Sequence, residues 1–265
     1  MPADVVDYQI FGEEMQFVEI ELDPGESAIA EAGMMMHKHP AITMDAVFGD
    51  GSNQNQSIWG ALLGAGKRLI TGESLFTTVF THKGTAGKAK VAFAAPYPGH
   101  ILALDLREFG GRLICQKDSF LAAARGVSLS IFFQRKILTG LFGGEGFIMQ
   151  QLEGDGMVFV HMGGCLIRKD LAPGEEIHVD TGCVAAFTQT VSFDVVQAGS
   201  IKSMIFAGEG VFFASLKGPG TVWIQSLPFS RLAGRMLASA PQSGGSTGEG
   251  SALGGLGDIV MGNNR

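Results

Sequence analysis

The sequence predicts an all-β protein in which three β-sandwich or short double-stranded β-helix repeats, related by pseudo-threefold symmetry, form one compact domain. Glycine occurs 39 times in 265 residues, about twice its usual share of ~7%, and the 19 phenylalanines outnumber the 2 Trp and 2 Tyr. Phenylalanine favours strands and glycine favours turns, so this composition indicates strands joined by tight turns. The strongest observation is internal repetition.

One template occurs three times along the chain: GESLFTTVFTHKG (72–84), GEGFIMQQLEGDG (144–156) and GEGVFFASLKGPG (208–220). Each copy opens with Gly-Glu, continues with an apolar-rich stretch and ends on a turn glycine. A second apolar stretch follows each time, which predicts a strand on both sides of that glycine. The equivalent residues that open the copies are Gly72 and Glu73, Gly144 and Glu145, and Gly208 and Glu209.

The three equivalent glutamates allow two interpretations. If Glu73, Glu145 and Glu209 lie near a threefold axis, they could bind one cation together. Alternatively, each carboxylate accepts hydrogen bonds from the backbone N–H groups of its adjacent turn, which is a structural role repeated because the fold repeats. We favour the structural role.

A glycine turn precedes each template, at Gly25, Gly111 and Gly174. Two of these turns contain Pro-Gly, which suits the centre of a type II turn because proline fixes φ and glycine accepts positive φ. The combined spacing predicts a β domain at 1–230 with repeats at about 8–100, 101–165 and 166–230.

Two segments fall outside this repeat pattern. The first repeat is longer than the others, and we place the insertion within 50–68. Apolar residues at helical spacing predict that SIWGALLGAGKRLI (57–70) forms a short amphipathic helix. Residues 231–265 are rich in glycine and serine, which predicts a flexible tail, although a turn or two of helix could open it.

Charge and hydropathy exclude several classes of protein. The net charge of −7 does not provide the basic face that nucleic-acid binding needs. No apolar stretch is long enough to cross a bilayer, and the N-terminus MPADVVDYQIFGEE is unlike a secretory signal. The three cysteines are widely spaced, which fits a reducing compartment. We therefore expect a cytoplasmic protein that binds no nucleic acid and does not span a membrane, while peripheral membrane contact stays open.

Two histidine-containing segments carry the candidate metal ligands. In EEIHVD, strand alternation places His178 on the same face as Glu176 and Asp180. In GMMMHKHP, Met34 and Met36 share one face and Met35, His37 and His39 share the other, so all five putative ligands cannot converge. The two candidate sets are therefore Glu176, His178 and Asp180, and Met35, His37 and His39. In both places an ordinary strand face is the favoured interpretation, and we expect no cofactor.

Other chemistry is not indicated by the sequence. GALLGAGKR departs from the phosphate-binding loop at its first glycine and at its Ser/Thr position. Cys165 and Cys183 have apolar neighbours, which favours packing in the core over nucleophilic catalysis. We expect the template phenylalanines to be core residues instead of base-stacking platforms: Phe76, Phe80, Phe147, Phe212 and Phe213.

Several motifs, taken in order, carry a resemblance that covers roughly residues 8–230: LDPGESAIAEAGMM, GKRLITGESLF, LFGGEGF, LAPGEEIHVDTGCVAAF, GEGVFFASLKGPG and IQSLP. The chain resembles the conserved bacterial and archaeal family related to the mitochondrial protein called "altered inheritance of mitochondria 24". The resemblance implies a fold like that of the trp RNA-binding attenuation protein, three structural repeats and a homotrimer. The mitochondrial relative is associated with inner-membrane organisation. The N-terminal residues do not have the Arg-rich amphipathic pattern of a transit peptide, so we do not expect that role to carry over directly.

The sequence thus predicts a non-enzymatic oligomeric scaffold or binding protein of unknown ligand, in which edge strands pair between copies and which could support membrane-associated complexes. The alternative is a metal-binding or small-molecule-binding enzyme of the double-stranded β-helix type. Stoichiometric bound metal would favour the enzyme, and a closed oligomer would favour the scaffold.

Overall fold

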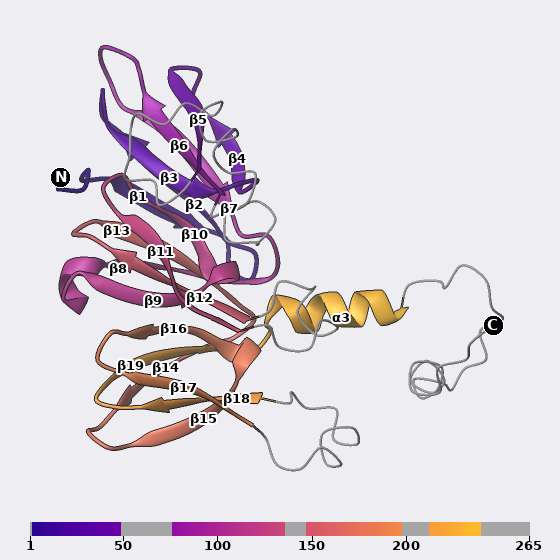
Figure 1. Ribbon diagram of the computed structural model, residues 1–265. Helices are drawn as coiled ribbons and strands as arrows, with labels where there is room; N and C mark the ends of the chain where they lie inside the picture. Colours follow the sequence, from indigo (N-terminus) through magenta and orange to yellow (C-terminus); the bar gives the residue numbers. More distant parts are fainter. Residues whose placement is uncertain (1, 49–75, 136–146, 198–211, 240–265) are drawn as a thin grey trace, which may run out of the picture.

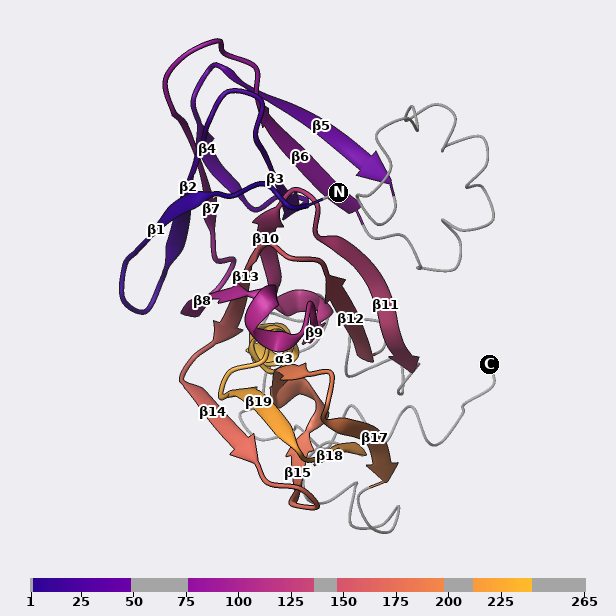
Figure 2. The ribbon, with the colours of Figure 1, turned by 90° about the vertical axis from the view of Figure 1, so that its left-hand side faces the viewer.

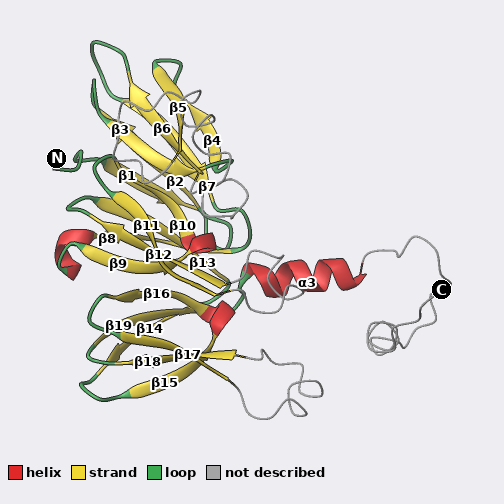
Figure 3. Cartoon of the chain, viewed as in Figure 1, coloured by secondary structure: helices red, strands yellow, loops and turns green. Residues whose placement is uncertain are grey.

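Four β-sheets are stacked one on another in the computed structural model of the chain, and the helix α3 projects from the stack (Figure 1). The structure describes residues 2–48, 76–135, 147–197 and 212–239. Strands dominate this part of the chain, as Figure 3 shows, so the prediction of an all-β protein is confirmed.

The described strands form three successive groups. The first group contains β1 (Asp7–Phe11), β2 (Phe17–Leu22), β3 (Ser27–Glu31), β4 (Met35–Lys38), β5 (Ile42–Phe48), β6 (Phe76–His82) and β7 (Ala89–Ala94). The second contains β8 (Gly99–Asp105), β9 (Arg112–Gln116), β10 (Phe120–Ala124), β11 (Ser128–Arg135), β12 (Phe147–Glu153) and β13 (Met157–Gly163). The third contains β14 (Leu166–Leu171), β15 (Glu176–Asp180), β16 (Val184–Thr188), β17 (Ser192–Gln197), β18 (Phe212–Lys217) and β19 (Gly220–Gln225).

The three groups have the same internal pairings. The last strand of each group lies between two others: β7 between β2 and β4, β13 between β8 and β10, and β19 between β14 and β16. The strand before it also lies between two others: β6 between β3 and β5, β12 between β9 and β11, and β18 between β15 and β17. Each group therefore builds two half-sheets of three strands, to one of which the first group adds β1 beside β2. The turn glycine of each template lies where the chain passes from one half-sheet to the other.

Half-sheets of neighbouring groups merge into larger sheets. Pairing of β3 with β10 creates the first inner sheet, β5-β6-β3-β10-β13-β8. Pairing of β9 with β16 creates the second inner sheet, β11-β12-β9-β16-β19-β14. The half-sheets left over are the first outer sheet, β1-β2-β7-β4, and the second outer sheet, β15-β18-β17. The view in Figure 2, turned by 90° from Figure 1, shows the strands of the first group uppermost, those of the second group in the middle and those of the third group lowest.

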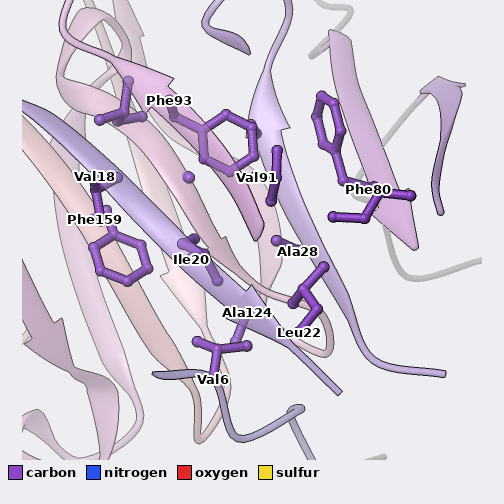
Figure 4. Packing of buried hydrophobic residues seen from close by; sticks show 14 of the residues in the cluster. Val6, Val18, Ile20, Leu22, Ala28, Phe80, Val91, Phe93, Ala124 and Phe159 are labelled. Carbon is purple, nitrogen blue, oxygen red and sulfur yellow. The ribbon is translucent and has the colours of Figure 1, made fainter. Parts of the chain in front are cut away.

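A hydrophobic core fills each of the three spaces between the sheets. Alternation in β2, where Val18, Ile20 and Leu22 are fully buried, supplies one wall of the first core (Figure 4). The inner sheets contribute to a core on each face, as β10 shows: Leu121 packs in the first core and Phe120 in the second. Burial on both faces explains why β10 and β16 read as continuous apolar runs.

The predicted glycine turns have the expected backbone. Gly25 has φ of 94°, and the N–H of Glu26 donates to the carbonyl of Asp23 at 2.9 Å. Gly174 has φ of 84° in an equivalent turn. Because β-branched and most other residues avoid positive φ, these glycines fix the turns at which β2 and β14 end.

The helix α3 (Phe229–Ser239) follows the last strand, and it occupies the start of the segment for which we predicted a flexible tail. The remainder of that segment, 240–265, and the helix predicted at 57–70 lie outside the described residues. Within the described ranges, no helix combines the length and apolar character required to cross a bilayer.

Candidate functional site: two unpaired strand edges

The strands β4 and β15 lie at edges whose counterparts are paired. β10 and β16 occupy the place of β4 in their groups, and each of them continues into the preceding half-sheet through β3 or β9. β4 is the last strand of the first outer sheet, and β15 is the first strand of the second outer sheet. The described chain therefore has a strand equivalent to β10 and β16 at one end of the stack, which is β4, and a strand equivalent to β3 and β9 at the other end, which is β15.

Burial differs sharply between β4 and its counterparts. All five residues of β10 and all five of β16 are buried, whereas Met35, Met36 and His37 of β4 are exposed. Met36 is 54% exposed, while Leu121 and Ala185 at the corresponding positions are 1% and 0% exposed. The edge of β4 therefore carries apolar side chains at positions that a neighbouring sheet covers elsewhere in the same molecule.

β15 shows the same contrast from the other side. Its counterpart β3 has four buried residues and one half-buried residue, whereas Glu176 and His178 of β15 are exposed and Ile177 is half-buried. Val179, on the face toward the third core, is buried with 9% exposure. An unpaired edge with this composition is open to pairing with another strand.

A β-bulge recurs at one position in the three groups and sets the direction of the side chains of β4. Met35 lies opposite Phe93 and His37 lies opposite Ala92, so one residue of β4 is extra. The same irregularity separates Phe120 from Ala122 in β10 and Val184 from Ala186 in β16. Phe93 and Ala92 are consecutive and face opposite sides of the sheet, so Met35 and His37 do so as well.

That bulge overturns the predicted arrangement of Met35, His37 and His39 on one face. The alternation on which the prediction relied is interrupted at Met36. His37 Nε2 instead lies 3.8 Å from Glu19 Oε2, and His39 Nδ1 accepts a hydrogen bond from the backbone N–H of Ala41 at 3.1 Å.

The structure brings together two of the three other metal candidates. His178 Nε2 lies 3.2 Å from Glu176 Oε1, and the hydroxyl of Ser215 donates to the same oxygen at 2.6 Å. The Ser215 hydroxyl, followed by the His178 imidazole, lowers the pKa of Glu176 from its ordinary value. Asp180 instead accepts from the backbone N–H of Gly182 at 2.9 Å and approaches Arg231. In the ranges that the structure describes, no three His, Cys, Asp or Glu side chains are grouped as a metal ion requires.

The remaining sequence candidates have mixed outcomes. All six repeat-equivalent Gly and Glu residues, from Gly72 to Glu209, lie outside the described residues. Phe80 and Phe147 are core residues, as predicted, while Phe212 and Phe213 are half-buried. The expectation of a core position is wrong for Cys165, which is exposed in the turn before β14, and Cys183 is half-buried beside Arg231. Cys115 is buried, and burial raises the pKa of its thiol.

Sequence reasoning missed a buried polar group beneath α3. The His161 and Tyr97 rings meet edge to face with centroids 4.5 Å apart, and they are 1% and 4% exposed. Burial lowers the pKa of His161 to about 4 and raises the pKa of Tyr97. In the third group, Gln225 occupies the position that His161 occupies in the second. The Gln225 amide oxygen accepts from the N–H of Gly163, and its NH₂ group donates to Gln116 and to the carbonyl of Gly182. Alignment of the second and third repeats is the signal that would have linked these two residues, because β13 pairs with β10 in the same register as β19 pairs with β16.

Comparison with known proteins agrees with this architecture. The family described as "Mitochondrial biogenesis AIM24" matches residues 8–227. An uncharacterised protein of Streptococcus pyogenes serotype M6 is 32% identical over 234 residues, which cover 86% of this chain and 89% of that protein. The crystal structure of a Streptococcus pyogenes protein is similar with a TM-score of 0.69 and 25% identity, covering 89% of this chain and all of that one. The chain therefore belongs to the AIM24 family.

Proposed function

We propose that the protein is a non-enzymatic scaffold or binding protein whose copies join edge to edge into a closed ring, with β4 of one copy pairing with β15 of the next. The observation that carries this proposal is the pair of edges, β4 and β15, that have no further strand partner among the described residues. Each is half of a junction that β3 and β10, and β9 and β16, complete within the chain. The three groups of strands with the same pairings support the three-repeat organisation on which the ring depends.

The internal junctions supply the register of the proposed one. Ala122 lies opposite Ala30 and Ala123 opposite Ile29 in the first junction, and Ala186 and Phe187 lie opposite Cys115 and Ile114 in the second. Applied to the free edges, this register places His37 opposite Val179 of the next copy and Lys38 opposite His178 of the next copy. Such antiparallel pairing would satisfy the free backbone groups of both edges.

Side-chain chemistry also supports the pairing. Met35 and Met36 are 37% and 54% exposed, and covering them contributes roughly 1.5–3 kcal/mol in total at the usual value for apolar burial. The two edges have complementary charge, because β4 carries Lys38 while β15 carries Glu176 and Asp180. In the proposed register Lys38 lies diagonally from both carboxylates, at a separation that long side chains reach.

Head-to-tail contacts of this kind close into a ring or continue into a filament. The family resemblance supports a ring of three copies, and the threefold repetition within each chain means that every junction around the ring has the same construction. A closed ring also removes both exposed edges, which a filament of finite length does not.

The test is the mass of the full chain in solution, measured by light scattering after size exclusion. We expect the mass of three chains for the wild type and a lower mass for Met36→Glu, because the substitution places a charge beside the proposed junction, at a position whose counterparts Leu121 and Ala185 are buried. Met44→Glu is the matched control, since Met44 is also 54% exposed but lies on β5, which pairs with β6 in a different sheet from β4 and β15. A monomeric wild type, or equal masses for the two variants, contradicts the ring.

Elemental analysis of the purified protein addresses the alternative of a metal-dependent enzyme. Stoichiometric metal that is lost on replacement of Glu176 and His178 contradicts a purely structural role.

A further inference from the structure

The helix α3 is attached to the sheets through its first turn. The ring of Phe229 lies 5.5 Å from that of Tyr97, and Arg231 Nη2 lies 3.9 Å from Asp180 Oδ2. No residue of α3 is buried, and Figure 1 shows the later turns extending away from the sheets. A helix with this placement lacks the tertiary packing that normally stabilises a short helix.

The sequence of α3, FSRLAGRMLAS, is amphipathic and basic. At 100° per residue, Phe229, Leu232 and Met236 fall on one side with Leu237 at its border, while Arg231 and Arg235 fall on the opposite side. Phe229, Met236 and Leu237 are 47%, 66% and 76% exposed. The helix contains no Asp or Glu, although the whole chain has a net charge of −7.

We propose that α3 lies on an anionic lipid surface, with Met236 and Leu237 inserted among the acyl chains and Arg235 at the level of the headgroups. A basic amphipathic helix with large apolar residues on one side is the form that binds in the plane of a membrane interface. The arginines favour an anionic bilayer over an apolar protein groove, because each basic residue near such a surface adds to the attraction.

The acidic body of the protein does not oppose this contact at the tip of the helix. An α-helix of 11 residues extends about 16 Å, whereas charges are screened over about 8 Å at physiological ionic strength. Arg235, Met236 and Leu237 lie in the last two turns, about 6–9 Å along the axis beyond Arg231, which is about one screening length from the point of attachment. The local charge of α3 therefore governs its encounter with a surface.

The strength of the contact, though not its existence, rests on the ring proposed above, because one helix of this size binds lipid weakly. Cyclic symmetry places the α3 helices of all copies at the same height on the ring, so they can reach one flat surface together. Simultaneous binding of several weak helices raises the overall affinity through effective concentration.

The experiment is co-sedimentation of the full chain with vesicles of phosphatidylcholine alone and with vesicles containing about one-third phosphatidylglycerol. We expect binding to the anionic vesicles at low salt, at least fivefold weaker binding to the neutral ones, and loss of the difference at high salt. Equal sedimentation of the protein with and without vesicles overturns the proposal. The apolar side of α3 would then bind in the groove of a partner protein.

Two pairs of variants separate α3 from the rest of the surface. Met236→Ser with Leu237→Ser should weaken partition about tenfold, while Ile167→Ser, which removes an apolar residue of 52% exposure on β14, should leave it unchanged. Arg235→Glu should weaken partition to anionic vesicles about tenfold, while Lys83→Glu, the same charge change in the turn after β6, should not. Equal losses in a variant and its control overturn the assignment to α3.

The same samples distinguish failure of this proposal from failure of the ring. A ring of the expected mass that ignores anionic vesicles overturns the lipid contact alone. A monomer that sediments with anionic vesicles through α3 overturns the ring alone and leaves the lipid contact standing.

Discussion

His161 is a titratable side chain held in an apolar setting, and this placement makes stability depend on pH. Its pKa of about 4 lies below the ordinary value of 6.5 because burial disfavours the imidazolium. Below pH 6.5 the unfolded chain therefore binds a proton that the folded chain does not, so stability falls as the pH drops toward 4 and levels off below it.

His161→Leu should remove this dependence. Between pH 7.5 and pH 4, the free energy of unfolding of the wild type should fall by about 3 kcal/mol more than that of the variant. Urea unfolding at the two pH values measures the difference, and the carboxylates that titrate in the same range cancel because both proteins contain them. Parallel pH profiles for the two proteins would contradict a buried neutral imidazole.

At the residue level, the sequence predicted which positions are glycine turns but not how each side chain is directed. The Pro-Gly turn at Gly25 follows from local φ preferences, which sequence contains directly. The faces of Met35 and His37 depend on a bulge, which inserts one residue without any required residue type at that position. Cys165 has apolar neighbours in sequence yet lies exposed in a turn, because burial depends on what the rest of the chain covers.

At the element level, α3 depends on local propensity more than any described strand does. Gly234 lies in the middle of the helix, and a Cβ built there meets nothing within 4 Å. Gly234→Ala should stabilise the helix by about 1 kcal/mol, because alanine has the highest helix propensity and glycine one of the lowest. Amide hydrogen exchange should then slow about fivefold in α3 and stay unchanged in β13, which serves as the internal reference.

Strands were easier to predict than this helix for a physical reason. The templates that became β12 with β13 and β18 with β19 repeat an apolar pattern bounded by glycines, and repetition reveals a pattern that any one copy would hide. α3 occurs once, includes Gly234 and has no buried face, so neither repetition nor burial marks it. Its amphipathic character becomes visible only when the residues after Pro228 are placed on a helix.

At the level of the whole molecule, the register of the proposed junction between copies can be fixed by a covalent bond. Lys38→Cys with His178→Cys, in a Cys165→Ser background, should form an intermolecular disulfide because the two positions lie opposite each other in the proposed pairing. Lys38→Cys with Glu176→Cys, displaced by two residues, is the matched control and should cross-link much less.

The size of the cross-linked product tests closure as well as register. In a closed ring of three copies, oxidation should yield species of one, two and three chains under non-reducing denaturing conditions, with no larger product. A continuing ladder would indicate an open filament.

The two inner sheets have a consequence for how the chain comes apart. Each of them forms a wall of two cores, so opening one core removes support from its neighbour through a sheet that both share. Partial unfolding should therefore begin at the outer sheets and spread inward as a single cooperative loss, unlike the independent melting of domains on a linker. By the same construction, a ring would have no outermost sheet at all, and assembly would deprive the molecule of the place where its unfolding starts.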